Sequence, residues 1–264
     1  MVNSEIKQLE TQLLDAVSYF LKTATATSIH HGELLERIRQ VDSRAFLCGG
    51  AIRDILLSKR DGRKSIIPRD LDIILGFEHP ETVAALFSDC KQKWNCYGGV
   101  EICHKHWSLD IWALQKTWAF EQGLIKGSSF RDFPNTTFLN IESVAVQLFS
   151  KRGKKREIYS KGFFESILTN TIEINLQENP NPKSCIARAL YIANKFGFKI
   201  GRKLANYIMQ TTHEIEIEEL LQAYQARYNQ REITADILNL WIKEIKRQLR
   251  AHQNLSIQLP VNDK

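Results

Sequence analysis

The chain has 264 residues, enough for one large or two modest domains that each bury a core. Hydrophobic residues make up 43% of it and charged residues 25%, as in soluble globular proteins, and no apolar run is long enough to span a bilayer, so we predict no membrane partner. The net charge of +6 favours anionic partners such as nucleic acid or nucleotides. Five cysteines at irregular spacings and a polar N-terminus without a signal-peptide pattern predict a cytoplasmic protein.

Apolar residues recur at helical spacing from Ile6 to Leu21, which predicts an amphipathic helix at the start of the chain, followed by a second helix near residues 33–40. Helices and strands then alternate. We predict a strand at 45–48, a helix at 51–57, a strand at 70–75, a helix at 80–90, strands at 99–106 and 108–114, and a hairpin over 143–159 with Gly153 at its bend. From Phe163 onward the pattern is helical, with "LQENPNPK" as a connector. This order predicts an α+β protein, with a mixed sheet and flanking helices followed by an all-helical C-terminal region.

Two acids lie one residue apart in the apolar run "DLDIIL". On a strand, Asp70 and Asp72 would point to the same side, where two adjacent carboxylates repel each other unless a cation lies between them. Asp110 lies in another apolar run, "SLDIW", and Glu101 on the neighbouring candidate strand is an alternative to it. Three converging carboxylates would hold Mg²⁺, and such a cluster can hold two metal ions about 3.5–4 Å apart.

A double glycine precedes the acids in "FLCGGAIRDILL". Gly49 and Gly50 would let backbone N–H groups approach phosphate oxygens at the start of the following helix, and Arg53 lies one turn into that helix. We therefore predict that the acids hold metal and that the metal holds a nucleoside triphosphate. Either pattern alone is more often a turn or an edge feature, and their combination in this order is what points to catalysis.

This combination resembles the head domain of class II CCA-adding enzymes and bacterial poly(A) polymerases, which belong to the DNA polymerase β-like nucleotidyltransferases. The resemblance lies in "GGAIRDILL" followed by "RDLDI", and continues more weakly in "FLNIESVAVQL", "REIYSKGFFESIL" and "ARALYIANKFGFKI". It implies a nucleotidyltransferase head over 31–165, preceded by the N-terminal helix at 1–30 and followed by a helical neck and body over 166–264. It also implies Mg²⁺-dependent transfer of a nucleotide to a 3′ hydroxyl, usually of RNA, with release of pyrophosphate.

Carried over by position, the resemblance makes Asp70, Asp72 and Asp110 the metal ligands and catalytic residues. The residues implied for the nucleotide are Gly49, Gly50 and Arg53 at the triphosphate, Asp54 bracing the loop, and Asn140 near the ribose. Two groups of basic residues would contact RNA: the run "KRGKKR", with Lys151, Arg152, Lys154, Lys155 and Arg156, and separately Arg188. The run is alternatively a solvated hairpin tip, and Arg188 a structural residue.

The chain departs from the family in the part that reads the base. The family has an acidic residue and an arginine where this chain has "NPKSC", residues 181–185, and a second arginine where it has Tyr191. The ribose-recognising Arg-Asp pair is replaced by Asn135 and Thr136, with Arg131-Asp132 a few residues upstream as a substitute. Selecting a base requires fixed donors and acceptors, so we do not predict a CCA-adding enzyme.

Three functions follow from these residues. The first is transfer of a nucleotide to an RNA 3′ end, with tRNA as the first expectation for the acceptor. The second keeps the chemistry but modifies a protein or a small molecule, as a toxin or defence enzyme would. The third is a module that binds an NTP or RNA without turnover. A zinc site at Cys96, Cys103, His104 and His106 is disfavoured by the spacing, and the tryptophans 107, 112 and 118 are expected in a core rather than against bases.

Overall fold

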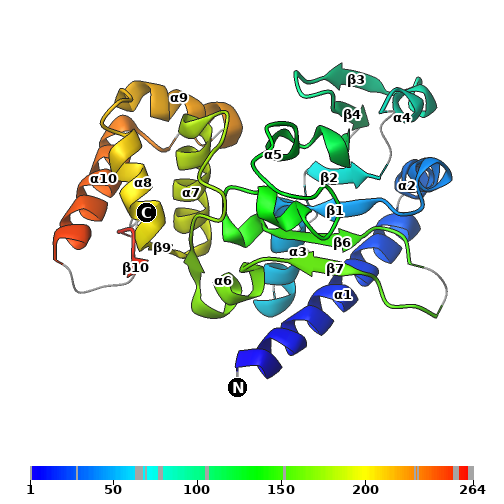
Figure 1. Ribbon diagram of the computed structural model, residues 1–264, viewed down its shortest axis with the longest axis horizontal. Coiled ribbons are helices and arrows are strands. Elements are labelled where there is room, and N and C mark those ends of the chain that lie inside the picture. Colours follow the sequence, from blue (N-terminus) through cyan, green and yellow to red (C-terminus); the bar gives the residue numbers. More distant parts are fainter. Residues whose placement is uncertain are drawn as a thin grey trace. The chain divides into compact units, whose positions relative to one another are not determined.

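A computed structural model describes residues 2–27, 29–62, 68, 70–76, 80–104, 107–150, 153–228, 230, 232–251 and 256–260 (Figure 1). The chain divides into two compact units, which we describe separately. Unit 1 comprises Met1–Thr137 and Glu142–Phe164, and unit 2 comprises Phe138–Ile141 and Glu165–Lys264. Within the described ranges, no helix combines the length and the apolar character that crossing a membrane requires.

Unit 1 is built around a seven-stranded sheet with the strand order β3-β4-β5-β2-β1-β6-β7. Its strands are β1 (Phe46–Cys48), β2 (Asp70–Leu75), β3 (Lys91–Trp94), β4 (Val100–His104), β5 (Trp107–Ala113), β6 (Val144–Gln147) and β7 (Ile158–Ser160). Strands β2 and β5 are parallel, and the other five neighbouring pairs are antiparallel. The predicted hairpin is confirmed as the β6–β7 pair.

Helices cover one face of this sheet. They are α1 (Val2–Thr27), α2 (Ile29–Val41), α3 (Gly50–Arg60) and α4 (Pro80–Leu86). Helix α3 packs against β1, β2 and β6, α1 packs along α3, and α4 packs against β4 and β5 (Figure 1). The apolar stripe predicted for the first helix is confirmed, because Leu13 and Val17 are fully buried. Beneath the helices lie strand residues that alternate with the acids, such as Leu71, Ile73 and Ile111, which are 0–1% exposed.

The opposite face of the sheet is divided between an apolar part and an acidic part. In the apolar part, Phe46, Ile74 and Ala145 form a small core with Leu114 and Phe133. Those last two belong to the segment after β5, which contains the turns η1 (Leu114–Lys116) and η2 (Phe133–Thr136) and the short helix α5 (Trp118–Glu121). Towards the other end of the strands lie the acids of β2 and β5. Burial of the apolar part anchors the segment after β5 beside the acidic part.

Unit 2 is mainly helical. The helices are α7 (Pro182–Phe196), α8 (Arg202–Thr211), α9 (Ile217–Tyr228) and α10 (Ala235–Arg250), while α6 (Phe163–Thr169) and the turn η3 (Asn140–Glu142) each run across the boundary between the units. Its core is mostly aliphatic, and an aromatic cluster adds to it: Tyr191 is stacked on Tyr228 at a centroid distance of 3.6 Å, and the buried Tyr224 packs near Trp241. A three-stranded sheet, with the order β10-β9-β8, adds to the predicted helical region; its strands are β8 (Thr171–Ile172), β9 (Lys199–Gly201) and β10 (Ser256–Ile257). The predicted α+β class is thus confirmed.

Candidate active site

The three predicted acids lie on one face of the unit 1 sheet. Asp72 and Asp110 are direct partners in the parallel ladder of β2 and β5, so their Cα atoms are about 4.8 Å apart. Asp70 pairs with Ser108 in the same ladder and shares the face of Asp72, because residues two apart on a strand point to the same side. All three acids are half-buried. The backbone therefore brings the predicted trio to adjacent positions.

Glu101 extends this acidic row by one strand. It pairs with Asp110 across the antiparallel ladder of β4 and β5, and so points to the same face. Its Oε1 accepts a hydrogen bond from the Ser108 hydroxyl at 2.9 Å. Glu101 thus has a partner within the sheet, which makes it a weaker candidate for the third metal ligand than Asp110.

The acids fit a divalent cation in donor type and in backbone register. Carboxylate oxygens are the ligands that Mg²⁺ prefers, and the backbones of β2 and β5 place Asp70, Asp72 and Asp110 at adjacent positions. Within the part of the chain that the structure describes, no three His, Cys, Asp or Glu side chains are gathered closely enough to hold an ion. Coordination of a metal ion by Asp70, Asp72 and Asp110 therefore stays a prediction.

Gly49 lies directly against the acids. Its backbone has φ 72° and ψ −147°, a combination that only glycine adopts readily. A Cβ atom at this position would lie 2.5 Å from Oδ2 of Asp72. Gly49 precedes α3, and Gly50 is the first residue of that helix. The close approach to the Asp72 carboxylate gives Gly49 a physical reason, and the triphosphate role of Gly49 and Gly50 stays a prediction.

Arg53 is held by two carboxylates. Its Nε donates to Asp54 at 2.8 Å and its Nη1 donates to Glu142 at 3.0 Å, and only 7% of its side chain is exposed. Its Nη2 lies 3.3 Å from the position that a Cβ of Gly50 would occupy. The guanidinium is thus fixed beside the double glycine. Asp54 contacts Arg53, and its predicted role in bracing the loop stays a prediction.

Glu142 is the site residue that the sequence analysis missed. It is 3% exposed and lies 89 positions from Arg53 along the chain. The signal was that Glu142 is the one charged residue in the mostly apolar run "FLNIESVAVQL", since a buried carboxylate needs a cation partner.

Asn140 belongs to unit 2, where it is hydrogen-bonded to the backbone of Glu173. Its backbone N–H donates to the Glu173 carbonyl at 3.0 Å, and its Oδ1 accepts from the Glu173 N–H at 2.9 Å. Its predicted role near the ribose is untested.

The basic residues of the β6–β7 hairpin differ in orientation. Lys154 and Lys155 are exposed, whereas Lys151 and Arg152 lie outside the described residues. Arg156 points inward, where it donates to the Leu148 carbonyl, to the Gln147 carbonyl at 3.1 Å and to the Ser18 hydroxyl at 3.2 Å. Burial lowers the pKa of Arg156. The exposed lysines are therefore better placed for RNA than Arg156.

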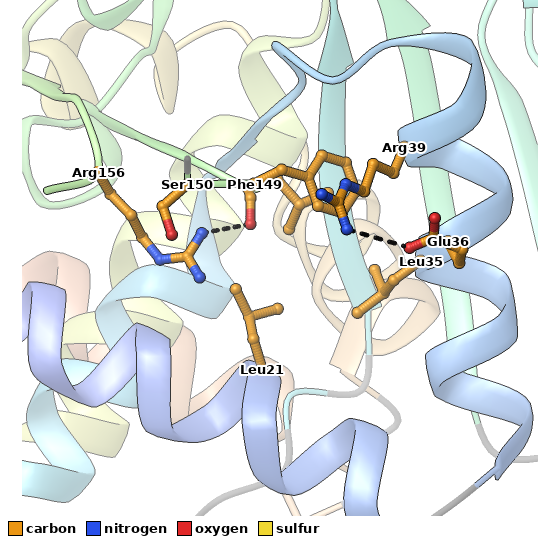
Figure 2. Close-up of a pocket in the computed structure, with 8 residues that line it drawn as sticks. Leu21, Leu35, Glu36, Arg39, Phe149, Ser150 and Arg156 are labelled. Carbon is orange, nitrogen blue, oxygen red and sulfur yellow. Dashed lines mark hydrogen bonds and ion pairs between the residues drawn. The ribbon is translucent and has the colours of Figure 1, made fainter. Parts of the chain in front are cut away.

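Arg156 also lines a cavity of about 230 Å³ between α1, α2 and the end of β6 (Figure 2). Figure 2 shows Arg39 across from Arg156, with Leu21 on α1 and Leu35 on α2. Arg39 is paired with Glu36 at 3.5 Å. None of the predicted catalytic residues lines it. Arg188 lies half-buried on α7 in unit 2, and its contact with a phosphate is untested.

The segments that replace the family's recognition motifs have structural roles. Asn181 caps α7 by accepting from the Ser184 N–H at 3.1 Å, so "NPKSC" begins a helix. Tyr191 is stacked on Tyr228. Asp132, which was considered as a substitute at the ribose, accepts two hydrogen bonds from Ser129, and these lower its pKa.

The cysteines and tryptophans allow two smaller conclusions. All five cysteines are free thiols, and of the residues considered for zinc, His106 and the His104 side chain lie outside the described residues. Trp112 packs against the small core on the acidic face, as expected, while Trp118 is half-buried near it.

Comparison with known proteins identifies the fold. No protein-family model matches the chain, and none of the curated proteins matches it. Solved structures do. A CCA-adding enzyme in complex with ATP has a TM-score of 0.60 and 16% identity over 90% of this chain, and a CCA-adding enzyme in complex with CTP has 0.59 and 18% over 89%. A tRNA nucleotidyltransferase complexed with a primer tRNA and an incoming ATP analogue has 0.54 and 17% over 80%.

These matches show that the chain has the fold of CCA-adding enzymes, which confirms the fold predicted from "GGAIRDILL" and "RDLDI". The chain spans 57%, 54% and 59% of the length of these three proteins, respectively.

Proposed function

We propose that the chain is a nucleotidyltransferase that transfers a nucleoside monophosphate from an NTP to the 3′ hydroxyl of RNA, with tRNA as the first candidate acceptor. The observation that supports this most is the register of Asp72 with Asp110 on parallel strands, with Gly49 packed against the Asp72 carboxylate. The fold shared with CCA-adding enzymes that bind ATP and CTP adds support.

In this proposal each part of the site has a distinct task. Asp70, Asp72 and Asp110 would hold Mg²⁺, which supplies positive charge at the transferred phosphate and the leaving pyrophosphate. The backbone N–H groups around Gly49 and Gly50 bind the triphosphate at the start of α3, where the helix dipole favours anions. Arg53 adds a cation that Glu142 and Asp54 hold in place. Asp110 also accepts the proton of the attacking hydroxyl.

The base is selected weakly in this proposal. The positions of the family's base-reading residues are occupied by a helix cap at Asn181 and by the stacked ring of Tyr191, neither of which offers a charged pair to a base edge. We therefore expect several NTPs to serve as substrates at comparable rates.

The test is transfer of label from each α-labelled NTP, with and without Mg²⁺, into total RNA, protein and small molecules. We expect label in RNA, and loss of that label in the double variant Asp70→Ala, Asp72→Ala. Asp236→Ala, which removes an exposed acid of α10, is the matched control. Label only in protein or small molecules would indicate another acceptor, and NTP binding without any transfer would indicate a binding module; either outcome contradicts the proposal.

A further inference from the structure

A second cavity lies on the acidic side of unit 1, beside β4 and β5. It has a volume of about 270 Å³, somewhat below the roughly 300–1,000 Å³ of pockets that enclose a whole drug-sized ligand. We call it the aromatic pocket, because four of its lining residues are aromatic: Tyr97, Trp112, Trp118 and Phe133. Its size and lining suit a single planar ring.

The aromatic pocket adjoins the acidic row. Trp112 lies two residues beyond Asp110 on β5, so its side chain shares the face of Asp110 and its Cα lies about 7 Å away. Gly99 completes the wall on the β4 side, because a Cβ there would lie 3.3 Å from Cβ of Trp112. The atom nearest to that position is Nδ2 of Asn95 at 2.8 Å, so a side chain at residue 99 would displace the Asn95 carboxamide from this wall.

Polar groups in the aromatic pocket are fixed at its edge. Oδ1 of Asn95 accepts from the N–H groups of Tyr97 and Gly99 at 2.9 and 3.0 Å, which orients the carboxamide and makes its amino group a donor at the wall. The Trp112 indole donates to the Thr117 hydroxyl at 3.1 Å, which fixes the ring plane. Lys116 adds a positive charge at the rim, paired with Glu121 at 3.1 Å.

The position of the aromatic pocket relative to the double glycine determines which substrate it fits. Gly49 lies on the β1 side of Asp72, whereas the pocket lies on the β4 side of Asp110, with the acids between them. In an in-line displacement the attacking oxygen approaches from the side opposite the leaving pyrophosphate. If the glycines hold the triphosphate, the acceptor approaches from the side of the pocket.

We propose that the aromatic pocket receives the terminal base of the acceptor RNA, stacked on Trp112 or Trp118 and covered by Tyr97. This inference rests on the proposed function and specifies its acceptor site. Stacking between a base and an aromatic ring tolerates any base, so the pocket would position the 3′ hydroxyl near Asp110 without selecting a sequence.

The test compares two short single-stranded RNAs that differ only in the last residue, a complete nucleotide in one and an abasic ribose in the other. Binding to the full chain is measured by fluorescence anisotropy without NTP. We expect the abasic RNA to bind about tenfold more weakly to the wild type. In Tyr97→Ala and Trp118→Ala, the complete RNA should bind as weakly as the abasic one does.

Trp94→Ala is the matched control, because Trp94 is 46% exposed and Tyr97 is 42% exposed in the same β3–β4 hairpin, yet only Tyr97 lines the aromatic pocket. Exposed positions carry little packing, and thermal unfolding verifies that each variant is folded. Equal binding of both RNAs to the wild type, or an undiminished difference in the pocket variants, overturns the inference. Binding of a peptide acceptor at the aromatic pocket, without binding of RNA there, also overturns the inference.

The binding assay tests the aromatic pocket and the transfer assay tests the proposed function, so either proposal can fail without the other. Transfer to RNA without discrimination between the two RNAs contradicts the pocket and leaves the proposed function standing. Discrimination without transfer contradicts the proposed function and retains the base site.

Discussion

Asp72 and Asp110 occupy the same register position on two parallel strands, with Gly49 packed against the first of them. Like charges directly opposite each other on neighbouring strands destabilise a sheet. An arrangement that costs stability and could be relieved by one substitution suggests that the two charges serve a function.

This relationship predicts that Asp110→Asn has opposite effects on stability and activity. Without Mg²⁺ the variant should be more stable than the wild type by up to about 1 kcal/mol, because the repulsion is removed. With Mg²⁺ and NTP its transfer rate should fall at least about 100-fold, because a metal ligand is lost. Thermal unfolding in EDTA and label transfer measure the two effects.

Glu101→Gln is the control for this prediction, since Glu101 shares the face but accepts a hydrogen bond from Ser108. It should retain most of the transfer. If Glu101→Gln abolishes transfer while Asp110→Asn preserves it, the third acid has been assigned to the wrong strand.

Gly49→Ala is predicted to fold less stably and to lose transfer. The backbone conformation of Gly49 costs another residue about 1–3 kcal/mol, and the added Cβ would displace the Asp72 carboxylate that lies 2.5 Å from it. Chemical denaturation gives the loss of stability, and transfer is measured at a temperature where the variant is folded.

Gly62→Ala separates backbone strain from displacement of the acid. Gly62 has φ 62°, and no atom of the described residues lies within 4 Å of its would-be Cβ, so among these residues its substitution strains the backbone without a close contact. We expect a cost of about 1–2 kcal/mol and normal transfer. Normal transfer by folded Gly49→Ala as well would argue against a role for this close approach.

Arg53→Ala is predicted to be among the most destabilising substitutions in unit 1. It would leave the buried carboxylate of Glu142 without its guanidinium, a change that costs about 3–5 kcal/mol in buried pairs. Arg37→Ala instead removes a more exposed ion pair with Asp89 and a hydrogen bond to the Leu86 carbonyl, and should cost less than Arg53→Ala, about 1–2 kcal/mol. Urea denaturation of both variants provides the comparison.

A combined substitution tests the reason for that loss. Arg53→Met with Glu142→Leu removes both charges, so it should recover part of the stability that Arg53→Ala loses. A double variant no more stable than Arg53→Ala would mean that lost packing or the lost pair with Asp54, rather than the charge of Glu142, dominates the effect.

Local sequence patterns predicted much of the fold and the part of the site that Asp70 and Asp72 form. The period of two in "DLDIIL" places Asp70 and Asp72 on one face, and the buried stripe of α1 follows from the spacing of Leu13 and Val17. Strand β3 was missed because "KQKW" carries the lysines of an edge strand rather than an apolar signal. Strands β8 and β10 have two residues each, too few for any periodicity.

The rest of the site depends on pairing between distant segments. Whether Asp110 neighbours Asp72 is decided by the crossover that makes β5 the parallel partner of β2, and the sequence left Glu101 as an alternative. Of the two carboxylates that hold Arg53, Asp54 is the next residue, but Glu142 is 89 positions away, and no local spacing pairs it with Arg53. Likewise, Trp112 and Trp118 were expected in a core, and only the folded chain places both at one cavity.

Unit 2 is predicted to lose stability in acid through Glu244. Its carboxylate accepts hydrogen bonds from Arg247 at 2.6 and 2.8 Å and from Gln248 at 2.6 Å, and these lower its pKa to about 2. Because the pKa is lower in the folded state, the ionised carboxylate stabilises the fold above its unfolded pKa of about 4.3, and this contribution disappears as the pH falls towards 2. Since Arg247 is 69% exposed, the contribution should be below about 1 kcal/mol.

Glu244→Gln isolates this contribution. The variant should be less stable than the wild type at pH 6, and the difference should vanish between pH 4 and pH 2, as followed by thermal unfolding at several pH values. Arg247→Ala removes the main cause of the shift and should reduce the pH dependence in the same way. A constant difference between Glu244→Gln and the wild type from pH 6 to pH 2 would show that the hydrogen bonds to Glu244, rather than its charge, stabilise α10.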